Sequence, residues 1–156
     1  MQKLERGKAE LIKKIVAKAR SHGGRGGNGA VERFVRLYYE HVPPRDMVER
    51  SLENLLGAAL SHWTLASRRK PGEAKVRVYN PSLEKDNWAA HHTMVEIVND
   101  DMPFLVDSVT AAIHNEDAVV HLVIHPLIRT LRDKRGRLSG LAVAGAGVRE
   151  SFMHFE

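Results

Sequence analysis

The sequence predicts an α+β fold in which helices come first and a small β-rich unit follows. Apolar residues recur at helical spacing up to about Ser67, Pro71-Gly72 then interrupts the pattern, and from Lys75 apolar and polar residues alternate as in a strand. A length of 156 residues allows about one domain with a core of its own. We therefore expect helices packed against a sheet.

Composition excludes several classes of protein. The chain is 43% hydrophobic and 28% charged, which is ordinary for a globular protein. No window approaches the ~18 uninterrupted apolar residues of a membrane span, and the start of the chain lacks the apolar core of a secretory signal. The chain has no cysteine, which excludes disulfides and thiolate chemistry. These features favour a cytoplasmic protein with no membrane partner.

The basic character of the chain belongs to one end. Residues 1–30 carry eight Lys or Arg and two Glu, whereas residues 31–156 carry sixteen Lys or Arg and seventeen Asp or Glu. A nucleic-acid-binding domain is expected to carry its basic patch on the fold itself. The strands expected over 92–98 and 119–130 also lack the aromatic residues that stack RNA bases. Nucleic acid is therefore the least favoured partner, and the basic end is interpreted as a solvated helical face.

The N-terminal region predicts helices joined by a break. Residues 1–20 form a basic amphipathic helix, and residues 21–29, with five glycines, form a linker that tethers it. Residues 30–70 form a helical hairpin. Its second, long helix starts at an Asp46 N-cap with a glutamate three residues later, and the cations at 68–70 lie at its C-terminus, where the helix dipole favours them.

Residues 71–156 predict the order β-β-α-β-β. Strands are expected over 75–79, 92–98 and 119–130, a helix over 103–115, and a returning strand after a turn at 132–136, with a further strand beginning at Glu150. A β-α-β unit with a following antiparallel strand is half of a ferredoxin-like sandwich. The complete sandwich needs a second helix and a last strand. We therefore expect the domain to be truncated at its C-terminus and the chain to belong to a longer protein.

Motifs for catalysis, metals and nucleotides are missing. The glycine-rich stretches at 23–29 and 140–147 match neither a P-loop nor a dinucleotide fingerprint, and no nucleophile elbow is present. His121 and His125 on one strand would be about 13 Å apart, too far to share an ion. The sequence predicts no metal site, and it predicts hydrogen-bonded histidines on a partly buried sheet face instead.

Acids cluster where the second strand meets the following helix. Asp100, Asp101 and Asp107 lie around Pro103, the expected start of that helix. Acids at a helix start cap free N–H groups and interact well with the helix dipole, and this structural interpretation is the favoured one. The alternative is a ligand or partner site at the junction. The same carboxylates would repel a phosphate from that helix end.

This junction resembles the ACT-domain pattern of amino-acid-sensing modules, in which an apolar strand, Asp-x-Pro-Gly-Leu, a helix and a second apolar strand follow one another. The span from about Phe34 to Phe155 is similar to the N-terminal region of the large bacterial NAD-specific glutamate dehydrogenases. The matching segments are FVRLYY from Phe34, RVYNP from Arg77, NDDMPFLVDS from Asn99, HLVIHP from His121 and ESFMH from Glu150.

The resemblance implies a parent enzyme that oxidises L-glutamate to 2-oxoglutarate and ammonium with NAD, on a catalytic domain far downstream. NAD is implied for that parent, and no cofactor or catalytic residue is expected in this chain. The implied role is a non-catalytic regulatory or assembly segment, with the rest of the parent enzyme, further copies of the chain in a homo-oligomer and a possible amino-acid effector as partners. The alternatives are a stand-alone amino-acid-binding module and, less favoured, a nucleic-acid-binding domain.

One residue departs from the ACT pattern. Phe104 stands where the pattern has the glycine that lets an effector approach the backbone. The large side chain would fill that space or pack into the core, which favours an interface or packing role over an effector pocket. The residues expected to take part in ligand binding or an interface are Asn99, Asp100, Asp101, Met102 and Phe104.

Overall fold

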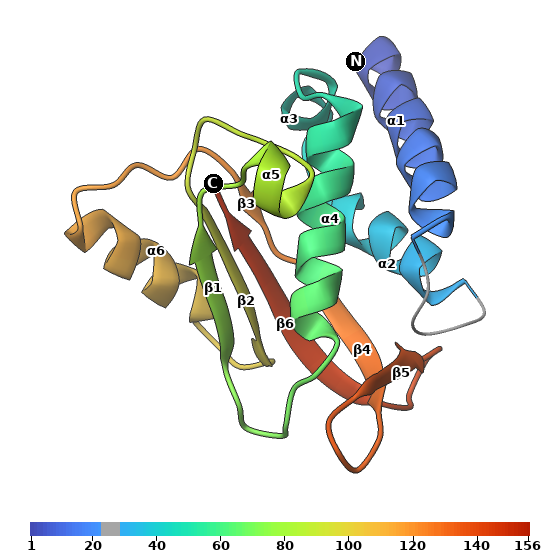
Figure 1. Ribbon diagram of the computed structural model, residues 1–156, viewed down its shortest axis with the longest axis vertical. Helices are drawn as coiled ribbons and strands as arrows, with labels where there is room; N and C mark the ends of the chain where they lie inside the picture. Colours follow the sequence, from blue (N-terminus) through green and yellow to red (C-terminus); the bar gives the residue numbers. More distant parts are fainter. Residues whose placement is uncertain (23–28) are drawn as a thin grey trace.

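The computed structural model describes residues 1–22 and 29–156, so most of the expected linker lies outside the described residues (Figure 1). The helices are α1 (Gln2–Arg20), α2 (Ala30–Tyr39), α3 (Pro44–Val48), α4 (Leu52–Ala66), α5 (Leu83–Asp86) and α6 (Leu105–Asn115). The strands are β1 (Lys75–Tyr79), β2 (Met94–Asp100), β3 (Val123–Ile124), β4 (Leu127–Arg132), β5 (Leu138–Leu141) and β6 (Val148–Phe155). The α+β fold class is confirmed.

All strands form one antiparallel sheet of order β1-β2-β6-β4-β5, with β3 also paired to β6. Because β2 and β4 each pair with β6 from opposite sides, they run parallel to each other, and α6 connects them across the sheet. This is the split β-α-β unit of a ferredoxin-like sandwich. Strand β1, which precedes this unit in the chain, lies at the outer edge beside β2, where the last strand of a complete ferredoxin-like sandwich lies.

The sheet has a helical layer on each face (Figure 1). Val98 and Phe152 belong to the main core, which they share with α1, α2 and α4. Their neighbours along the strands, Ile97 and Met153, face the other way and pack against α6. Successive side chains of a strand point to opposite faces, so the central strands β2 and β6 are apolar on both sides.

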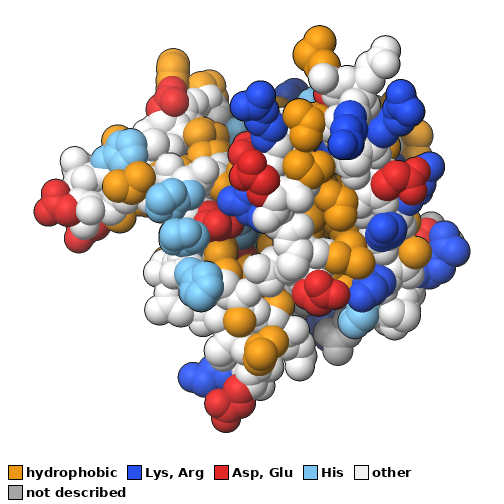
Figure 2. All heavy atoms as spheres, turned by 90° about the horizontal axis from the view of Figure 1, so that it is seen from above, with side chains coloured by type: hydrophobic (Ala, Val, Ile, Leu, Met, Phe, Trp, Pro, Cys, Tyr) orange, Lys and Arg blue, Asp and Glu red, His pale blue; other side chains and the backbone are white. Residues whose placement is uncertain are grey.

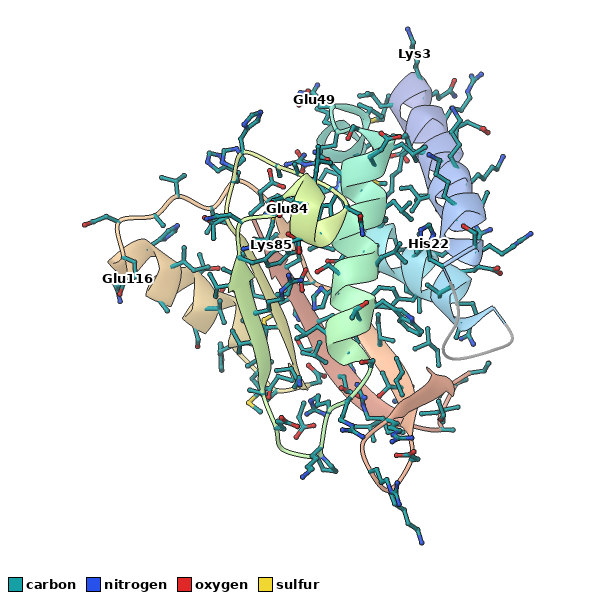
Figure 3. The ribbon with its side chains drawn as sticks, viewed as in Figure 1. Lys3, His22, Glu49, Glu84, Lys85 and Glu116 are labelled. Carbon is teal, nitrogen blue, oxygen red and sulfur yellow. The ribbon has the colours of Figure 1, made fainter. Side chains whose placement is uncertain are left out.

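Helix α1 docks on its own chain. Ile15, Val16 and Ala19 are buried against the helical layer. The Nζ atom of Lys8 donates to the carbonyl oxygens of Glu40 and Val42 at 2.6 and 2.8 Å, which holds α1 against the end of α2. The other lysines of the helix are exposed, and Lys3 extends into solvent (Figure 3). The basic end is therefore a solvated helical face.

The sequence predicts one long helix from Asp46, and this prediction is wrong, because the structure has two helices in this region. Pro44 opens the short α3, and α4 begins after Ser51, whose Oγ accepts a hydrogen bond from the Asn54 N–H at 3.1 Å. A serine at this position satisfies a free N–H group of the first turn, as an N-cap does. The apolar spacing continues across the break and therefore hides it.

The expected strand over 119–130 is also interrupted. Only Val123–Ile124 and Leu127–Thr130 pair with β6, whereas His121 and Leu122 bond to the backbone of Glu156, just after β6. Pro126 lies between the two segments and its carbonyl oxygen accepts a hydrogen bond from the Phe152 N–H at 3.1 Å. Proline has no N–H to donate, so the ladder is broken at this point.

Within the described ranges, no helix combines the length and hydrophobicity needed to cross a membrane.

Arg69, one of the three cations that follow α4, is buried. Its side chain is 1% exposed and forms ion pairs with Asp100 of β2 and, at 3.2 Å, with Glu150 of β6. Arg132 of β4 also binds Glu150, with its Nε atom 2.7 Å from Oε1. The network joins the end of α4 to three strands. Burial of a charge is tolerated only where it is paired and hydrogen-bonded in this way.

We expect Arg69→Met to lower the free energy of unfolding by about 3–5 kcal/mol, because it leaves Glu150 buried beside one cation instead of two. Urea unfolding followed by far-UV circular dichroism measures the loss. Arg68→Met is the matched control, since Arg68 is exposed and its replacement should cost less than about 0.5 kcal/mol. Equal losses in the two variants would contradict a structural role for the buried network.

Candidate functional site

The junction singled out in the sequence lies where β2 ends. Asn99 and Asp100 are the last residues of β2 and pair with Ser151 and Glu150 of β6, so they precede the helix by several residues. The expectation that the acids cap the helix is wrong. The N-cap of α6 is Phe104, without a side-chain capping bond, and only Asp107 lies in the first turn.

Both acids of the junction bind arginines of the same chain. Asp100 pairs with Arg69, and an Oδ atom of Asp101 lies 3.0 Å from Nε of Arg149. The backbone N–H of Asp101 also donates to the carbonyl oxygen of Arg149 at 3.2 Å. These contacts hold the β2–α6 connection against the sheet. They also neutralise the two carboxylates, which would otherwise attract an ammonium group.

Met102 and Phe104 lie at the surface, 48% and 77% exposed. Phe104 therefore does not pack into the core. Its φ of 67° is in the left-handed region, which glycine adopts without strain. The glycine of the ACT pattern thus suits the backbone at this position, and Phe104 keeps that backbone while presenting an aromatic ring to solvent. Ligand or interface binding by the five junction residues stays a prediction.

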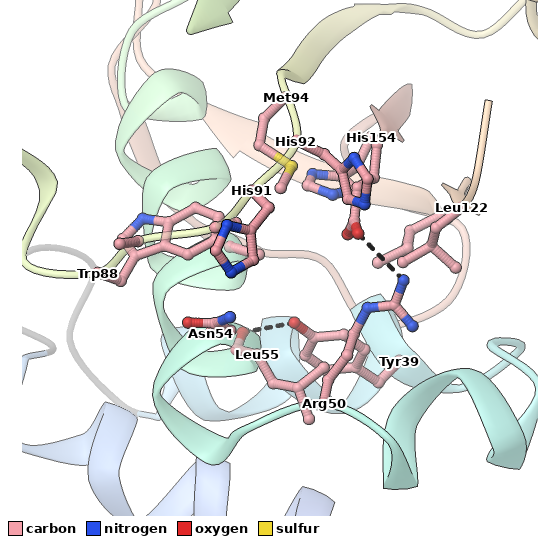
Figure 4. Close-up of a pocket in the computed structure, with 15 residues that line it drawn as sticks. Tyr39, Arg50, Asn54, Leu55, Trp88, His91, His92, Met94, Leu122 and His154 are labelled. Atoms are coloured by element: carbon pink, nitrogen blue, oxygen red, sulfur yellow. Dashed lines mark hydrogen bonds and ion pairs between the residues drawn. The ribbon is translucent and has the colours of Figure 1, made fainter. Parts of the chain in front are cut away.

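A cavity of about 380 Å³ lies elsewhere, between the start of α4, the segment before β2 and the end of β6 (Figure 4). Its walls are mainly apolar and include Trp88, Met94 and Leu122. Trp88 is seated on α4 at Gly57, where a Cβ atom would lie 2.2 Å from the indole Cγ. The glycine therefore allows the indole to approach the helix and form one wall of the cavity.

The polar groups of the cavity come from separate parts of the chain. Arg50 follows α3 and binds Glu156 with an Nη–Oε distance of 3.2 Å. Asn54 belongs to the first turn of α4, and His154 belongs to β6. The sequence analysis missed this cavity, because Arg50 and Glu156 stand 106 positions apart and neither lies in a motif.

His154 is 1% exposed, and among the described residues its Nδ1 atom has no hydrogen-bond partner. Burial lowers the pKa of its imidazole to about 3, and nearby His62 and Arg50 act in the same direction. The ring is therefore neutral at physiological pH. A neutral imidazole has one N–H donor and one acceptor nitrogen, and here the buried Nδ1 is left without a partner among the described residues.

His91 and His92 line the cavity, and several histidine side chains gather on one part of the face that Figure 2 shows. The rings of His92 and His121 stack with centroids 4.4 Å apart. The expectation of hydrogen-bonded histidines on a partly buried sheet face is wrong for the exposed His121, whereas Nε2 of His125 lies 2.7 Å from Oγ of Ser151 in a partly buried hydrogen bond. In the part of the chain that the structure describes, no group of His, Cys, Asp or Glu side chains could hold a metal ion.

A second buried polar cluster joins α4 to the sheet. Nε2 of His62 donates to the Ile97 carbonyl oxygen at 2.9 Å, so its Nδ1 accepts from the Tyr38 hydroxyl, also at 2.9 Å. The Tyr79 hydroxyl donates to Glu96 at 2.6 Å, and burial raises the pKa of the Glu96 carboxyl. These bonds orient the helical layer on the sheet.

The comparisons with known proteins identify this fold. Residues 34–156 match the family described as the glutamate dehydrogenase ACT1 domain. The chain belongs to this family. Over 138 residues, which are 88% of the chain, it is 33% identical to an NAD-specific glutamate dehydrogenase of Halomonas elongata. It is 29% identical over 153 residues, 96% of the chain, to an NAD-specific glutamate dehydrogenase of Pseudomonas aeruginosa.

The ACT1 chain spans 9% of the length of each of these two relatives. It is therefore similar to a small part of a much larger enzyme. No solved structure matches the chain. The resemblance seen in the sequence is confirmed, and the ACT-like unit coincides with the split β-α-β sheet and its flanking helices.

We expect the ACT1 chain to lose stability as the pH falls from 6.5 towards 4. Burial lowers the pKa of His62 to about 4, well below the 6.5 of an exposed histidine, so in this range the unfolded chain binds a proton that the folded chain does not. Each such histidine contributes about 1.4 kcal/mol per pH unit in the interval between its two pKa values. Urea titrations at several pH values measure how steeply the free energy of unfolding changes with pH.

The His62→Gln chain lacks the group that takes up this proton on unfolding. Between pH 6.5 and 5 its free energy of unfolding should therefore fall less steeply than that of the wild type. The comparison of slopes cancels groups common to both proteins, including Glu96, whose raised pKa acts in the opposite direction. His114→Gln is the control, because His114 is exposed on α6 and should leave the slope unchanged. The interpretation fails if His62→Gln keeps the wild-type slope.

Proposed function

We propose that the ACT1 chain is a non-catalytic assembly and regulatory segment of a large NAD-dependent glutamate dehydrogenase. The parent reaction would convert L-glutamate, NAD and water to 2-oxoglutarate, ammonium and NADH, with NAD bound elsewhere in the parent. Support comes from the family match and from relatives of which the chain spans 9%. The partners are the rest of the parent enzyme and further copies of the chain.

The proposed role in assembly is supported by one face of the sheet that α6 covers only in part. Val76 and Val78 of β1 are 56% and 63% exposed and lie opposite Ile97 and Val95 on the α6 side. Helix α6 packs over the middle of this face and leaves the valines in solvent. Exposed apolar side chains grouped in this way mark interaction surfaces.

The same face continues on the other side of α6. Leu127 and Leu131 of β4 are 41% and 39% exposed. Leu127 pairs with Ser151, which alternates with Phe152 of the main core and therefore faces α6. In addition, β1 is an edge strand with one row of backbone groups available for pairing. We call the face formed by β1, α6 and β4 the assembly face.

We expect the ACT1 chain to self-associate at micromolar concentration and Val78→Lys to weaken this association at least tenfold. The new charge would have to be buried in the contact, whereas in the monomer it lies in solvent. Sedimentation equilibrium measures the association constant. Leu83→Lys is the control, since Leu83 is 71% exposed on α5 and away from the assembly face. A monodisperse wild-type monomer would contradict assembly through this chain alone.

A substitution of Phe104 tests whether the junction residues take part in a contact or in an effector pocket. We infer that the exposed ring of Phe104 takes part in a contact rather than in an effector pocket, which is consistent with the pairing of Asp100 and Asp101 with arginines. Phe104→Gly should keep the free energy of unfolding within about 1 kcal/mol of the wild type. The relief of left-handed strain, roughly 1–2 kcal/mol, is offset by the entropy of glycine in the unfolded chain.

The same variant should weaken self-association, again measured by sedimentation equilibrium. Calorimetric titration with a panel of amino acids is the counterpart experiment. Saturable heat that is lost in Asp101→Asn and altered in Phe104→Gly would favour effector sensing at the junction and count against the contact role.

A further inference from the structure

The α4–β1 connection and the β4–β5 hairpin meet at the lower end of the molecule in Figure 1, where an antiparallel bridge pairs Arg68 with Arg137. Backbone hydrogen bonds of 2.9 Å flank this pair on both sides, one of them from the Arg69 N–H to the Gly136 carbonyl oxygen. The two bridged arginines exchange no backbone bond with each other. In this arrangement opposite Cα atoms lie closest, about 4.5 Å apart, so the two side chains start from neighbouring points.

The bridge therefore holds two exposed guanidinium groups near each other. Directly opposite side chains lie on the same face of a ladder, where like charges are destabilising. Arg69, between them and the sheet, points the other way and is buried with Asp100 and Glu150. Within the described residues, Arg68 and Arg137 form no ion pair. An anion bound between them would remove an unfavourable contact.

The acids of the two turns bind the backbone of those turns. Oδ1 of Asp133 accepts hydrogen bonds from the N–H groups of Arg135 and Arg137 at 2.8 and 3.0 Å. Oε2 of Glu73 accepts one from the Lys70 N–H at 2.9 Å. Both carboxylates therefore stabilise the turns that present the cations.

Positive charge predominates on this part of the surface. We call its five exposed cations the cationic end: Arg68, Lys70, Lys134, Arg135 and Arg137. Five cations against the two carboxylates of the turns leave a local charge of +3. Residues 31–156 as a whole carry sixteen Lys or Arg and seventeen Asp or Glu, so the rest of this span is net negative. A basic surface separated in this way attracts an acidic partner.

The groups left for a partner are side chains. The backbone N–H groups of Lys70, Arg135 and Arg137 are already bonded to carboxylates, so they are not available to cradle a phosphate. The cationic end also contains no aromatic ring on which a nucleic-acid base could stack. Guanidinium groups are planar and pair bidentately with carboxylates. These features favour carboxylates over nucleic acid.

From this combination we propose that the cationic end binds an acidic protein segment, rich in aspartate and glutamate. One carboxylate of the segment lies between Arg68 and Arg137 and bonds to both. Lys134 and Arg135, at the tip of the hairpin, bind further carboxylates. The cationic end lies outside β1, α6 and β4, so this binding goes beyond the proposed self-association and does not depend on it.

Titration of the 156-residue chain into a fluorescein-labelled oligoglutamate, followed by fluorescence anisotropy, tests the proposal. Saturable binding is expected, and added salt should weaken it, because exposed charges are screened over about 8–10 Å at physiological ionic strength. Arg68→Gln combined with Arg137→Gln should weaken binding by about fivefold or more. Circular dichroism should show that this variant melts no lower than the wild type, because it removes two like charges that the bridge places together.

Arg6→Gln combined with Arg36→Gln is the matched control. Both arginines are exposed, on α1 and α2, and form no ion pair within the described residues, so the control loses the same charge and should bind as the wild type does. The proposal is overturned if the peptide does not bind, if the bridge variant binds as the wild type does, or if the control loses as much affinity. Tighter binding of an oligothymidylate with the same number of charges would assign the cationic end to nucleic acid instead.

Discussion

Strand β6 is the constraint on which the rest of the structure depends. It pairs with β2 on one side and with β3 and β4 on the other, so no other strand has as many partners. Its side chains from Glu150 to Phe155 are all buried. Phe152 joins the helical core and Met153 the α6 core, so a register slip of one residue would place each in the wrong layer.

The start of β6 also explains why a buried arginine is tolerated. Glu150 is fully buried and needs cations, which Arg69 and Arg132 bring from a loop and from β4. Neither arginine would be stable there without the carboxylate, and the carboxylate would not be stable without them. The ionic network therefore sets the position of the α4–β1 connection relative to the sheet. Helix α4, which carries Asn54 and Ala58 into the cavity wall, is held by this connection.

The sequence predicts most elements because their signals are local. The helical spacing of α1 and α2, the alternation of β1 and the turn at Gly136, whose φ is 77°, each depend on neighbouring residues. The burial of Arg69 could not be predicted in this way. Arg68, Arg69 and Lys70 are alike in type, and what distinguishes Arg69 is a carboxylate on β6 that only the fold brings near it. The cavity could not be predicted for the same reason, since the two residues of its ion pair, Arg50 and Glu156, are far apart in the chain.

The two faces of the sheet are suited to different kinds of contact. On the α6 side, exposed valines and leucines lie on strands that flank a helix, and such a broad apolar surface fits another protein surface. On the side of the helical layer, a partly open cavity of about 380 Å³ has mainly apolar walls. His154 and Phe155 are neighbours on β6 and face these two sides. Strand β6 therefore contributes side chains to both layers that pack on the sheet.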